Sequence, residues 1–255
     1  DWQLHRTPNV PIVRAVAVKS HETVFTGGFE DLGRWDSDIS GKLHYTSFRN
    51  LLQKENLQNE NIWKIWVDQD KVYFQSFSYI YIYENGSIRT IGIPNGFLFL
   101  LQVRDEFLVQ EMYGPIYRFS QGELHKMDNC DFLNGQIARV ILPYGRDQYL
   151  IGVSSGEIYL YNEKQYSLWN KKLSNQLSGQ ELNCGLYSSK RDLYYLGTQL
   201  NGIYEVNVRG EITNHFTTNN ILQNNTILSV YEDDLANIWA AMDRGLVCMR
   251  YTDGL

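Results

Sequence analysis

Cysteine and proline are scarce in this chain, and long hydrophobic runs are missing. Three cysteines (Cys130, Cys184 and Cys248) and five prolines stand among 255 residues. The odd cysteine count, with no C-x-x-C pair and no histidine at ligand spacing, predicts unpaired buried thiols and no metal site. The longest apolar stretch, GFLFLLQV at residues 96–103, has the length of a buried strand, whereas a membrane-spanning helix needs about 20 residues. We therefore expect no membrane segment in this chain.

Clustered positive charge is also missing. The formal net charge is -6, and the densest basic cluster is the pair Lys171-Lys172. Phosphate binding requires clustered Lys and Arg, so we expect no nucleic-acid partner. The first ten residues, DWQLHRTPNV, lack the basic start and apolar core of a signal peptide. Either a signal was removed or this chain is a piece of a longer protein.

Aromatic residues, by contrast, are abundant. The chain has 18 Tyr, 11 Phe and 6 Trp, a composition that favours β-strands. The stretch SYIYIYENGSIRTIGI, residues 78–93, predicts a β-hairpin with its turn at Asn85-Gly86. An isolated hairpin is at best marginally stable in water, and both faces of this one are apolar or aromatic. Neighbouring elements must therefore cover both faces.

A short apolar-aromatic strand core recurs along the chain and identifies those neighbours. Its copies read GRWD, YIYIY, PIYRF, EIYLY, GIYEV and GLVCM. The positions taken as equivalent are Arg34, Ile80, Ile116, Ile158, Ile203 and Leu246, which are 36 to 46 residues apart, with a mean of about 42. This spacing is typical of four-stranded propeller blades, each of which buries its faces against the next.

Each repeat follows one order of elements. An apolar inner strand such as NIWKIWV precedes a polar turn, a second strand such as KVYFQSF, the recurring third strand, and a Gly-bearing turn into a fourth. The only helix we expect is a short one in FRNLLQKEN, residues 48–56. The prediction is an all-β fold, a β-propeller of about six four-stranded antiparallel blades, with residues 1–255 forming a single domain. A β-sandwich with coincidental spacing is the alternative.

The ends of the chain leave the blade count open. The last repeat, residues 226–251, shows three strands before TDGL, and the start, DWQLHRTP, reads as a lone outer strand. The first strand could complete the last blade in a six-bladed ring. Alternatively, a further blade outside this chain would make a ring of seven.

The last repeat also carries a family resemblance. NNTILSVYEDDLANIWAAMDRGL, residues 224–246, resembles the two-component regulator propeller repeat. The matching positions are Asn225, Ile227, Val230, Asp233, Trp239, Gly245 and Leu246. Ala236 stands where that repeat usually has a turn glycine, and Ala241-Met242 stand where Gly-Thr is usual.

The resemblance implies a function. Proteins of this family are extracytoplasmic sensors of bacterial regulators, placed ahead of a transmembrane segment and a cytoplasmic histidine kinase or helix-turn-helix output. The resemblance implies a periplasmic, non-enzymatic sensor in signal transduction and transcription regulation, with any kinase activity in a domain outside this chain. It also implies a small-molecule or oligosaccharide ligand, a glycan or its breakdown product, and a homodimer formed through the full-length receptor.

An enzyme would need a convergent set of catalytic residues. Three of the five histidines, His44, His125 and His215, fall on predicted fourth strands, where they are too far apart to form one site. No phosphate-cradling glycine loop occurs, so we expect no cofactor. A propeller enzyme, a polysaccharide lyase or glycosidase, remains the alternative. Its paired carboxylates would come from Glu30, Asp31, Glu111, Glu157 and Asp243. A protein-interaction scaffold of WD-repeat kind lacks its Gly-His and Trp-Asp signatures.

The connections between second and third strands are the best candidates for a binding face, because loops on a rigid scaffold carry recognition residues. Aromatic rings beside carboxylates and amides suit a sugar. The predicted ligand-binding residues are Phe29, Glu30, Phe77, Tyr79, Glu111, Tyr113, Gln199, Asn201, Asp243 and Arg244. The alternative for Phe77 and Tyr79 is packing between blades, and the alternative for the acids is solvation in turns.

Overall fold

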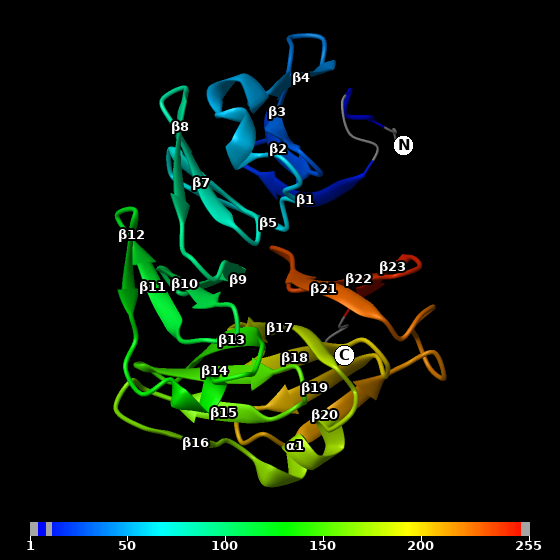
Figure 1. Ribbon diagram of the computed structural model, residues 1–255. Helices are drawn as coiled ribbons and strands as arrows, with labels where there is room; N and C mark the ends of the chain where they lie inside the picture. The colour runs from blue at the N-terminus through cyan, green and yellow to red at the C-terminus, as the bar shows by residue number, and fades with distance from the viewer. Residues whose placement is uncertain (1–4, 9–11, 251–255) are drawn as a thin grey trace. The chain divides into compact units, whose positions relative to one another are not determined.

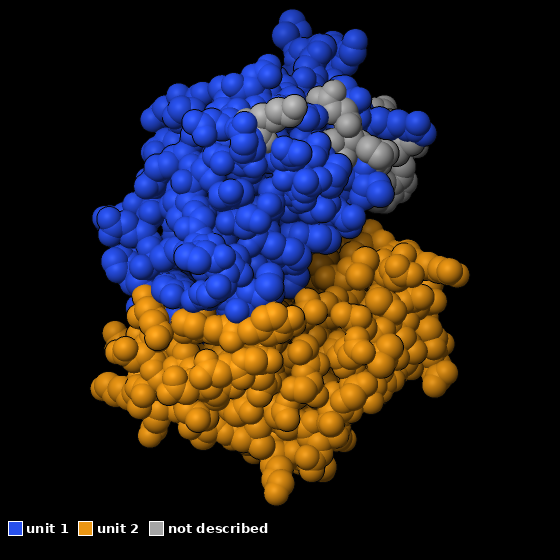
Figure 2. Space-filling view, viewed as in Figure 1, with its two compact units in different colours: residues 1–102, 106–112, 116–125 blue, residues 103–105, 113–115, 126–255 orange. Residues whose placement is uncertain are grey.

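The chain forms six antiparallel sheets, in each of which strands consecutive in the sequence pair with one another. The computed structural model describes residues 5–8 and 12–250. Within this part, five sheets have four strands and the last has three. The fold is a β-propeller with six blades, as the repeat spacing predicts. The chain divides into two compact units, coloured separately in Figure 2: unit 1 holds residues 1–102, 106–112 and 116–125, and unit 2 holds the rest.

Unit 1 contains blades 1 to 3, apart from the last residues of β9 and β12 (Figure 1). Blade 1 consists of β1 (Val13–Val18), β2 (Thr23–Gly28), β3 (Asp31–Ser37) and β4 (Leu43–Ser47). The short 3-10 helices η1 (Arg49–Leu51) and η2 (Lys54–Asn56) lead to blade 2. Blade 2 consists of β5 (Lys64–Asp68), β6 (Lys71–Gln75), β7 (Tyr79–Glu84) and β8 (Ser87–Gly92). Blade 3 consists of β9 (Phe97–Val103), β10 (Glu106–Glu111), β11 (Ile116–Ser120) and β12 (Glu123–Lys126).

Unit 2 contains blades 4 to 6, preceded by the 3-10 helix η3 (Asp131–Leu133). Blade 4 consists of β13 (Ala138–Tyr144), β14 (Gln148–Val153), β15 (Ile158–Tyr161) and β16 (Tyr166–Leu168). Helix α1 (Lys171–Leu177) connects it to blade 5, which consists of β17 (Leu182–Ser188), β18 (Leu193–Thr198), β19 (Ile203–Asn207) and β20 (Ile212–Phe216). Blade 6 consists of β21 (Ile227–Glu232), β22 (Ile238–Met242) and β23 (Leu246–Met249).

The predicted hairpin is the outer half of blade 2, formed by β7 and β8. Asn85 and Gly86 have φ of 49° and 78°, the left-handed conformation that a two-residue type I′ turn requires. Both faces are covered within unit 1. Tyr81 joins a core cluster with Phe25 of blade 1, whereas Ile80 joins one with Phe107 of blade 3. The prediction that adjacent blades seal this hairpin is confirmed.

Adjacent blades pack closely where a glycine stands near the end of the second strand. A side chain at each of three such glycines would lie within 2.5–2.7 Å of the branched residue that opens the next blade. The pairs are Gly27 with Ile62, Gly152 with Leu182, and Gly197 with Ile227. These branched residues are almost fully buried. The absence of a side chain at the glycine therefore allows the next blade to pack against it.

A β-bulge recurs at the start of the first strand in blades 1, 4, 5 and 6. The inserted residues are Arg14, Arg139, Asn183 and Leu228. Two of them form hydrogen bonds to the following blade's entry: Arg14 Nε donates to Asn61 Oδ1 at 2.8 Å, and Asn183 Nδ2 donates to the Ile227 carbonyl at 2.7 Å. A bulge re-aims a side chain out of the pleat, and here it connects neighbouring blades.

Two sequence predictions about the elements were wrong. In blade 1 the residue paired with Gly27 is Leu32, and in blade 4 the residue paired with Gly152 is Ile158. Leu32 is therefore the position equivalent to Ile158, two residues before Arg34, which the sequence comparison had chosen. The helix expected at residues 48–56 is the two 3-10 turns η1 and η2, whereas α1 was missed. The signal for α1 was present, because Asn170 caps the helix at 3.0 Å from Leu173 N. Leu173 and Leu177, one turn apart, are buried in the core of unit 2.

Three further predictions concern the cysteines, the chain ends and membrane-spanning segments. All three cysteines are unpaired, as predicted, but only Cys130 is buried, whereas Cys184 and Cys248 are half-buried. The start and the C-terminal TDGL lie outside the described residues, and the predicted outer strand at the N-terminus lies there in part. No helix of the described part is long and apolar enough to cross a membrane.

Candidate functional site

The predicted binding residues all lie in, or one residue beside, the connections between second and third strands. Five belong to unit 1 (Phe29, Glu30, Phe77, Tyr79 and Glu111), and five belong to unit 2 (Tyr113, Gln199, Asn201, Asp243 and Arg244). Their position in or beside these connections is the one that the sequence predicted. Their role in binding stays a prediction.

Glu30 lies at the edge of a cavity of about 510 Å³ in unit 1. Its backbone has φ of 52°, a left-handed conformation that is uncommon for a residue with a side chain. Its Oε1 accepts a hydrogen bond from Asn59 N at 2.8 Å, and its Oε2 is 4.0 Å from a guanidinium nitrogen of Arg49. The cavity is lined by Glu30, Arg49, Asn50, Leu52, Gln53, Leu57 and Gln58.

This cavity depends on the segment between blades 1 and 2. Arg49 belongs to η1, and Leu57 and Gln58 follow η2, so two tight turns bring amide, guanidinium and apolar groups around one carboxylate. Glu30 N donates to the Glu60 carbonyl at 2.8 Å, which fixes the second-to-third-strand connection against this segment. The cavity therefore presents hydrogen-bond donors and acceptors on a braced backbone.

A second cavity of about 510 Å³ lies between the β6–β7 and β8–β9 connections of unit 1. It is lined by Phe77, Ser78, Tyr79, Gly92, Ile93, Pro94, Asn95, Gly96 and Met112. Asn95 Nδ2 donates to Glu111 Oε1 at 2.5 Å, and the Tyr117 hydroxyl donates to Glu111 Oε2 at 3.1 Å. The structure therefore brings Phe77 and Tyr79 to one cavity, with Glu111 held beside it by a residue of its wall.

Phe77 also packs between blades 2 and 3, as its alternative interpretation held. Its ring stacks on Trp63, with centroids 5.3 Å apart, and meets Phe99 edge-on at 5.9 Å. Two cations cover the outer members of this aromatic row: the Arg14 guanidinium is 4.7 Å from the Trp63 ring, and Lys64 Nζ is 5.6 Å from the Phe99 ring. These cation–π contacts and the ring stacking hold the wall of the second cavity in place.

The predicted residues of unit 2 are partly engaged within their own blades. Asn201 Nδ2 donates to the Tyr204 hydroxyl at 2.7 Å, and Gln199 Nε2 is 3.5 Å from Asn183 Oδ1. Asp243 and Arg244 are exposed. Tyr113 is 55% exposed and has φ of 58°, so its backbone resembles that of Glu30.

The acidic and histidine side chains show little convergence. Asp31 is buried and accepts hydrogen bonds from the Ser47 hydroxyl at 2.6 Å and the Tyr45 hydroxyl at 3.0 Å, and burial together with this carboxylate raises the pKa of Tyr45. His44, His125 and His215 lie on β4, β12 and β20, the fourth strands predicted for them. Within residues 5–8 and 12–250, no group of three or more His, Cys, Asp or Glu side chains could hold a metal ion.

Sequence reasoning missed several cavity residues. Arg49, Gln53, Gln58 and Asn95 lie in connections between blades, outside the second-to-third-strand loops on which the prediction concentrated. The polar run FRNLLQKENLQNEN, residues 48–61, was a usable signal, because polar side chains in a long connection often carry recognition.

The fold defines the chain as a β-propeller, and unit 1 has two cavities that include residues of the β2–β3 and β6–β7 connections. No family model matches the sequence, and no curated protein matches it either. Solved structures do share the fold. The extracellular domain assigned to the hybrid two component system BT4673 from B. thetaiotaomicron aligns with a TM-score of 0.73 at 16% identity, over 99% of this chain and 35% of that one.

Two further structures are similar over most of the chain. The extracellular domain assigned to the hybrid two component system BT3049 from B. thetaiotaomicron gives a TM-score of 0.64 at 13% identity, over 98% of this chain and 46% of that one. Virginiamycin B lyase from Staphylococcus aureus gives 0.67 at 13% identity, over 90% and 77%. The chain thus spans about a third to a half of the sensor structures. The fold of this chain is thus similar to those of two-component sensor domains, which agrees with the resemblance seen in the sequence.

Proposed function

We propose that this chain is a ligand-sensing propeller from the periplasmic region of a bacterial transmembrane signalling regulator, with no catalytic activity of its own. The observation that carries the proposal is the alignment of 99% of the chain with the extracellular domain of a two component system. The repeat of residues 224–246, which resembles the two-component regulator propeller repeat, supports it independently. In this proposal residues 1–255 act as a single propeller domain within a longer receptor that forms homodimers.

The proposed ligand is a glycan or a breakdown product of one. The first cavity offers a carboxylate, a guanidinium and amides, which suit sugar hydroxyls. The second offers Phe77 and Tyr79 beside Asn95, which suit the apolar face of a sugar ring. Signalling would require two arrangements of the receptor that bind the ligand with different affinity.

The direct test is a thermal-shift screen of the purified chain against oligosaccharides, with chromatography of each mixture. A ligand at a hundredfold its dissociation constant should stabilise the protein by about 2.7 kcal/mol, or about 5–10 °C in melting temperature. The oligosaccharide should be recovered unchanged. Release of products would reject the sensor role, and the absence of any shift across the screen would reject the glycan.

A matched pair of variants tests the site itself. Glu30→Gln removes the carboxylate of the first cavity and should weaken oligosaccharide binding at least tenfold, because hydrogen bonds to a charged group contribute about 1.5–3 kcal/mol. Glu22→Gln changes an exposed residue outside the cavity and should leave affinity within twofold. Equal affinities in both variants would place the ligand elsewhere.

A second candidate is a propeller lyase, favoured by the similarity to virginiamycin B lyase. A similar structure is described as catalytically inactive after a histidine substitution. In the present chain His44 is 2.8 Å from Asp38, and His215 stacks on Tyr204 with its Nε2 2.7 Å from the Asn201 carbonyl. These histidines are held by their own blades, which supports the sensor over the enzyme.

A further inference from the structure

Unit 2 contains a cavity at the end of the blades opposite the predicted binding face. Tyr144 ends β13 and Asp192 immediately precedes β18, whereas the β18–β19 connection, with Gln199 and Asn201, follows the other end of β18. The cavity has a volume of about 330 Å³, at the small end for ligand sites. It is lined by Pro143, Tyr144, Gly145, Tyr187, Asp192, Tyr194 and Val208.

Three tyrosines line this cavity, of which Tyr144 and Tyr187 are half-buried and Tyr194 is buried behind them. The rings of Tyr187 and Tyr194 are 4.8 Å apart between centroids. Trp169 contacts Tyr194 at 5.4 Å and Tyr144 at 6.0 Å, so it connects two of the three lining rings. Tyr194 is buried and its hydroxyl donates to the Pro143 carbonyl at 2.9 Å. These contacts fix the rings before any ligand arrives.

Asp192 is the charged residue of the cavity lining. Its Oδ1 accepts a hydrogen bond from the Tyr187 hydroxyl at 2.7 Å, and this bond, together with burial, raises the pKa of Tyr187. The other carboxylate oxygen, Oδ2, accepts no hydrogen bond from the described residues. Asp192 has φ of 57° and is exposed, so its turn presents a carboxylate beside the three aromatic rings.

A neighbouring cation, Arg104, binds the β13–β14 turn. Arg104 Nη2 lies 2.9 Å from the Gly145 carbonyl, 3.1 Å from that of Gln148 and 3.4 Å from that of Tyr144, and its guanidinium is 5.5 Å from the Tyr149 ring. Arg104 therefore braces the turn that carries Tyr144, and its side chain is engaged by backbone carbonyls and the Tyr149 ring.

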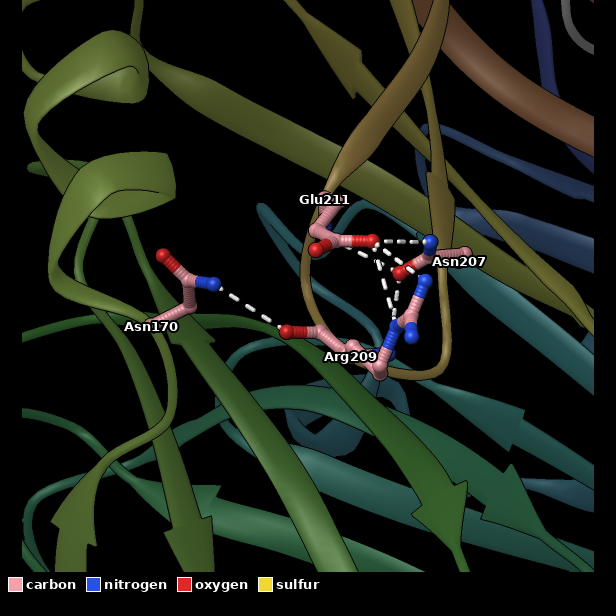
Figure 3. A network of polar contacts seen from close by, with 4 residues as sticks. All are labelled: Asn170, Asn207, Arg209 and Glu211. Atoms are coloured by element: carbon pink, nitrogen blue, oxygen red, sulfur yellow. Dashed lines mark hydrogen bonds and ion pairs between the residues drawn. The ribbon is translucent and has the colours of Figure 1, made fainter.

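Another lining residue, Val208, lies in the turn whose polar network is drawn in Figure 3. Asn207 Nδ2 donates to Glu211 Oε2 at 2.8 Å, and Arg209 binds the same oxygen at 3.0 and 3.2 Å. Asn170 Nδ2 donates to the Arg209 carbonyl at 3.1 Å, which ties this turn to the residue that follows Trp169. Val208 lies within the network's turn, so its place in the cavity wall is fixed from both sides.

We propose that this cavity binds a small organic ammonium ion. Tyrosine rings attract a cation to their faces, and the carboxylate of Asp192 supplies the countercharge at the cavity's edge. The small volume restricts the ligand to a compact amine or quaternary ammonium compound. The site is separate from the cavities of unit 1, so it would be a second input, independent of the glycan proposal.

The test uses choline as a probe and its uncharged isostere, 3,3-dimethyl-1-butanol. Saturation-transfer NMR with the intact chain should detect binding of choline to the protein. Titration should show that the isostere binds at least tenfold more weakly than choline. Asp192→Asn, which keeps an acceptor for Tyr187, should weaken choline binding at least tenfold. Asp147→Asn, a substitution of an exposed residue in the adjacent β13–β14 turn, is the matched control and should change affinity less than twofold.

Tyr187→Phe separates charge recognition from hydrogen bonding. This variant keeps the ring and should retain choline affinity within about threefold. A loss as large as that of Asp192→Asn would overturn the proposal, as would equal binding of choline and its isostere, or binding of neither. Circular dichroism melting of each variant shows whether it is folded. Failure here would leave oligosaccharide binding by the Glu30 cavity intact, so the two proposals fail separately.

Discussion

Asp233 uses both carboxylate oxygens to hold the turn between β21 and β22. Oδ1 accepts the backbone N–H groups of Leu235 at 2.9 Å and Asn237 at 2.8 Å. Oδ2 accepts the indole N–H of Trp239 and the side-chain amide of Asn237, both at 2.9 Å. These hydrogen bonds, that from Trp239 foremost, lower the pKa of Asp233 from 3.8 to about 2. Asp233 and Trp239, two of the positions that carry the family resemblance, are thus direct partners.

This geometry predicts an acid-dependent contribution to stability. Because the folded-state pKa is lower than the unfolded one, the contribution of Asp233 is present above about pH 4 and is lost as the pH falls through about 2. Asp233→Asn should therefore lower the melting temperature at pH 7, and the difference from the wild type should shrink between pH 4 and pH 2. Differential scanning calorimetry over this range measures it.

The control for this prediction is the neighbouring exposed residue Asp234, which lies in the same turn. Asp234→Asn should show little change in melting temperature, with no narrowing between pH 4 and pH 2. A difference for Asp233→Asn that stays constant with pH would show that the turn does not depend on the charge of the carboxylate.

At the scale of elements, the packing of one blade on the next depends on a glycine and on the residue that opens the following strand. A Cβ at Gly197 would lie 2.6 Å from Cys184 Sγ and 2.7 Å from Ile227 Cγ2. Gly197→Ala should therefore lower the free energy of unfolding by about 1–3 kcal/mol, the usual cost of overpacking. Urea denaturation followed by tryptophan fluorescence provides the measurement.

A double-mutant cycle shows whether the clash is the cause. Ile227→Ala alone should cost about 2–5 kcal/mol through its cavity. The combination with Gly197→Ala should cost less than the sum by about 1 kcal/mol, because the truncated side chain makes room for the new methyl group. Strict additivity would refute contact between β18 and the start of β21 as the origin of the effect.

At the scale of the whole molecule, the two units offer different surfaces. Unit 1 carries the two larger cavities, near Glu30 and near Phe77, and unit 2 carries the smaller aromatic cavity near Asp192. A glycan bound as proposed should slow hydrogen exchange in unit 1 peptides that cover residues 49–61 and 93–97. Peptides that cover residues 207–211 of unit 2 should exchange at the same rate with and without the sugar.

Mass spectrometry of exchange, with the oligosaccharide that gives the largest thermal shift, measures this pattern. Choline should protect the region around Asp192 instead, and the two ligands together should protect both regions. Protection of unit 2 alone by the oligosaccharide would contradict the assignment of the glycan to unit 1.

Local chemistry explains why so many elements could be predicted. Alternating aromatic and branched residues define strands by their own preferences, and Asn85-Gly86 specifies a hairpin turn through φ alone. The recurring strand core then predicted about six blades in this chain. Helix α1 was not predicted because only two leucines, Leu173 and Leu177, mark its buried apolar face, and the segment lies between predicted strands. Arg34 was misaligned because the first repeat pairs Leu32 with Gly27, a relation that only strand register reveals.

The sequence by itself determined the repeat, the strand order within each blade and the loop positions of residues such as Glu30 and Tyr79, because these follow from periodicity and turn chemistry. Only the tertiary structure decided which side chains share a cavity. Arg49 meets Glu30, and Asp192 meets Tyr144, across 19 and 48 positions of the sequence. These contacts between distant residues depend on how bulges and glycines allow successive blades to pack. The local conformational preference of neither residue predicts them.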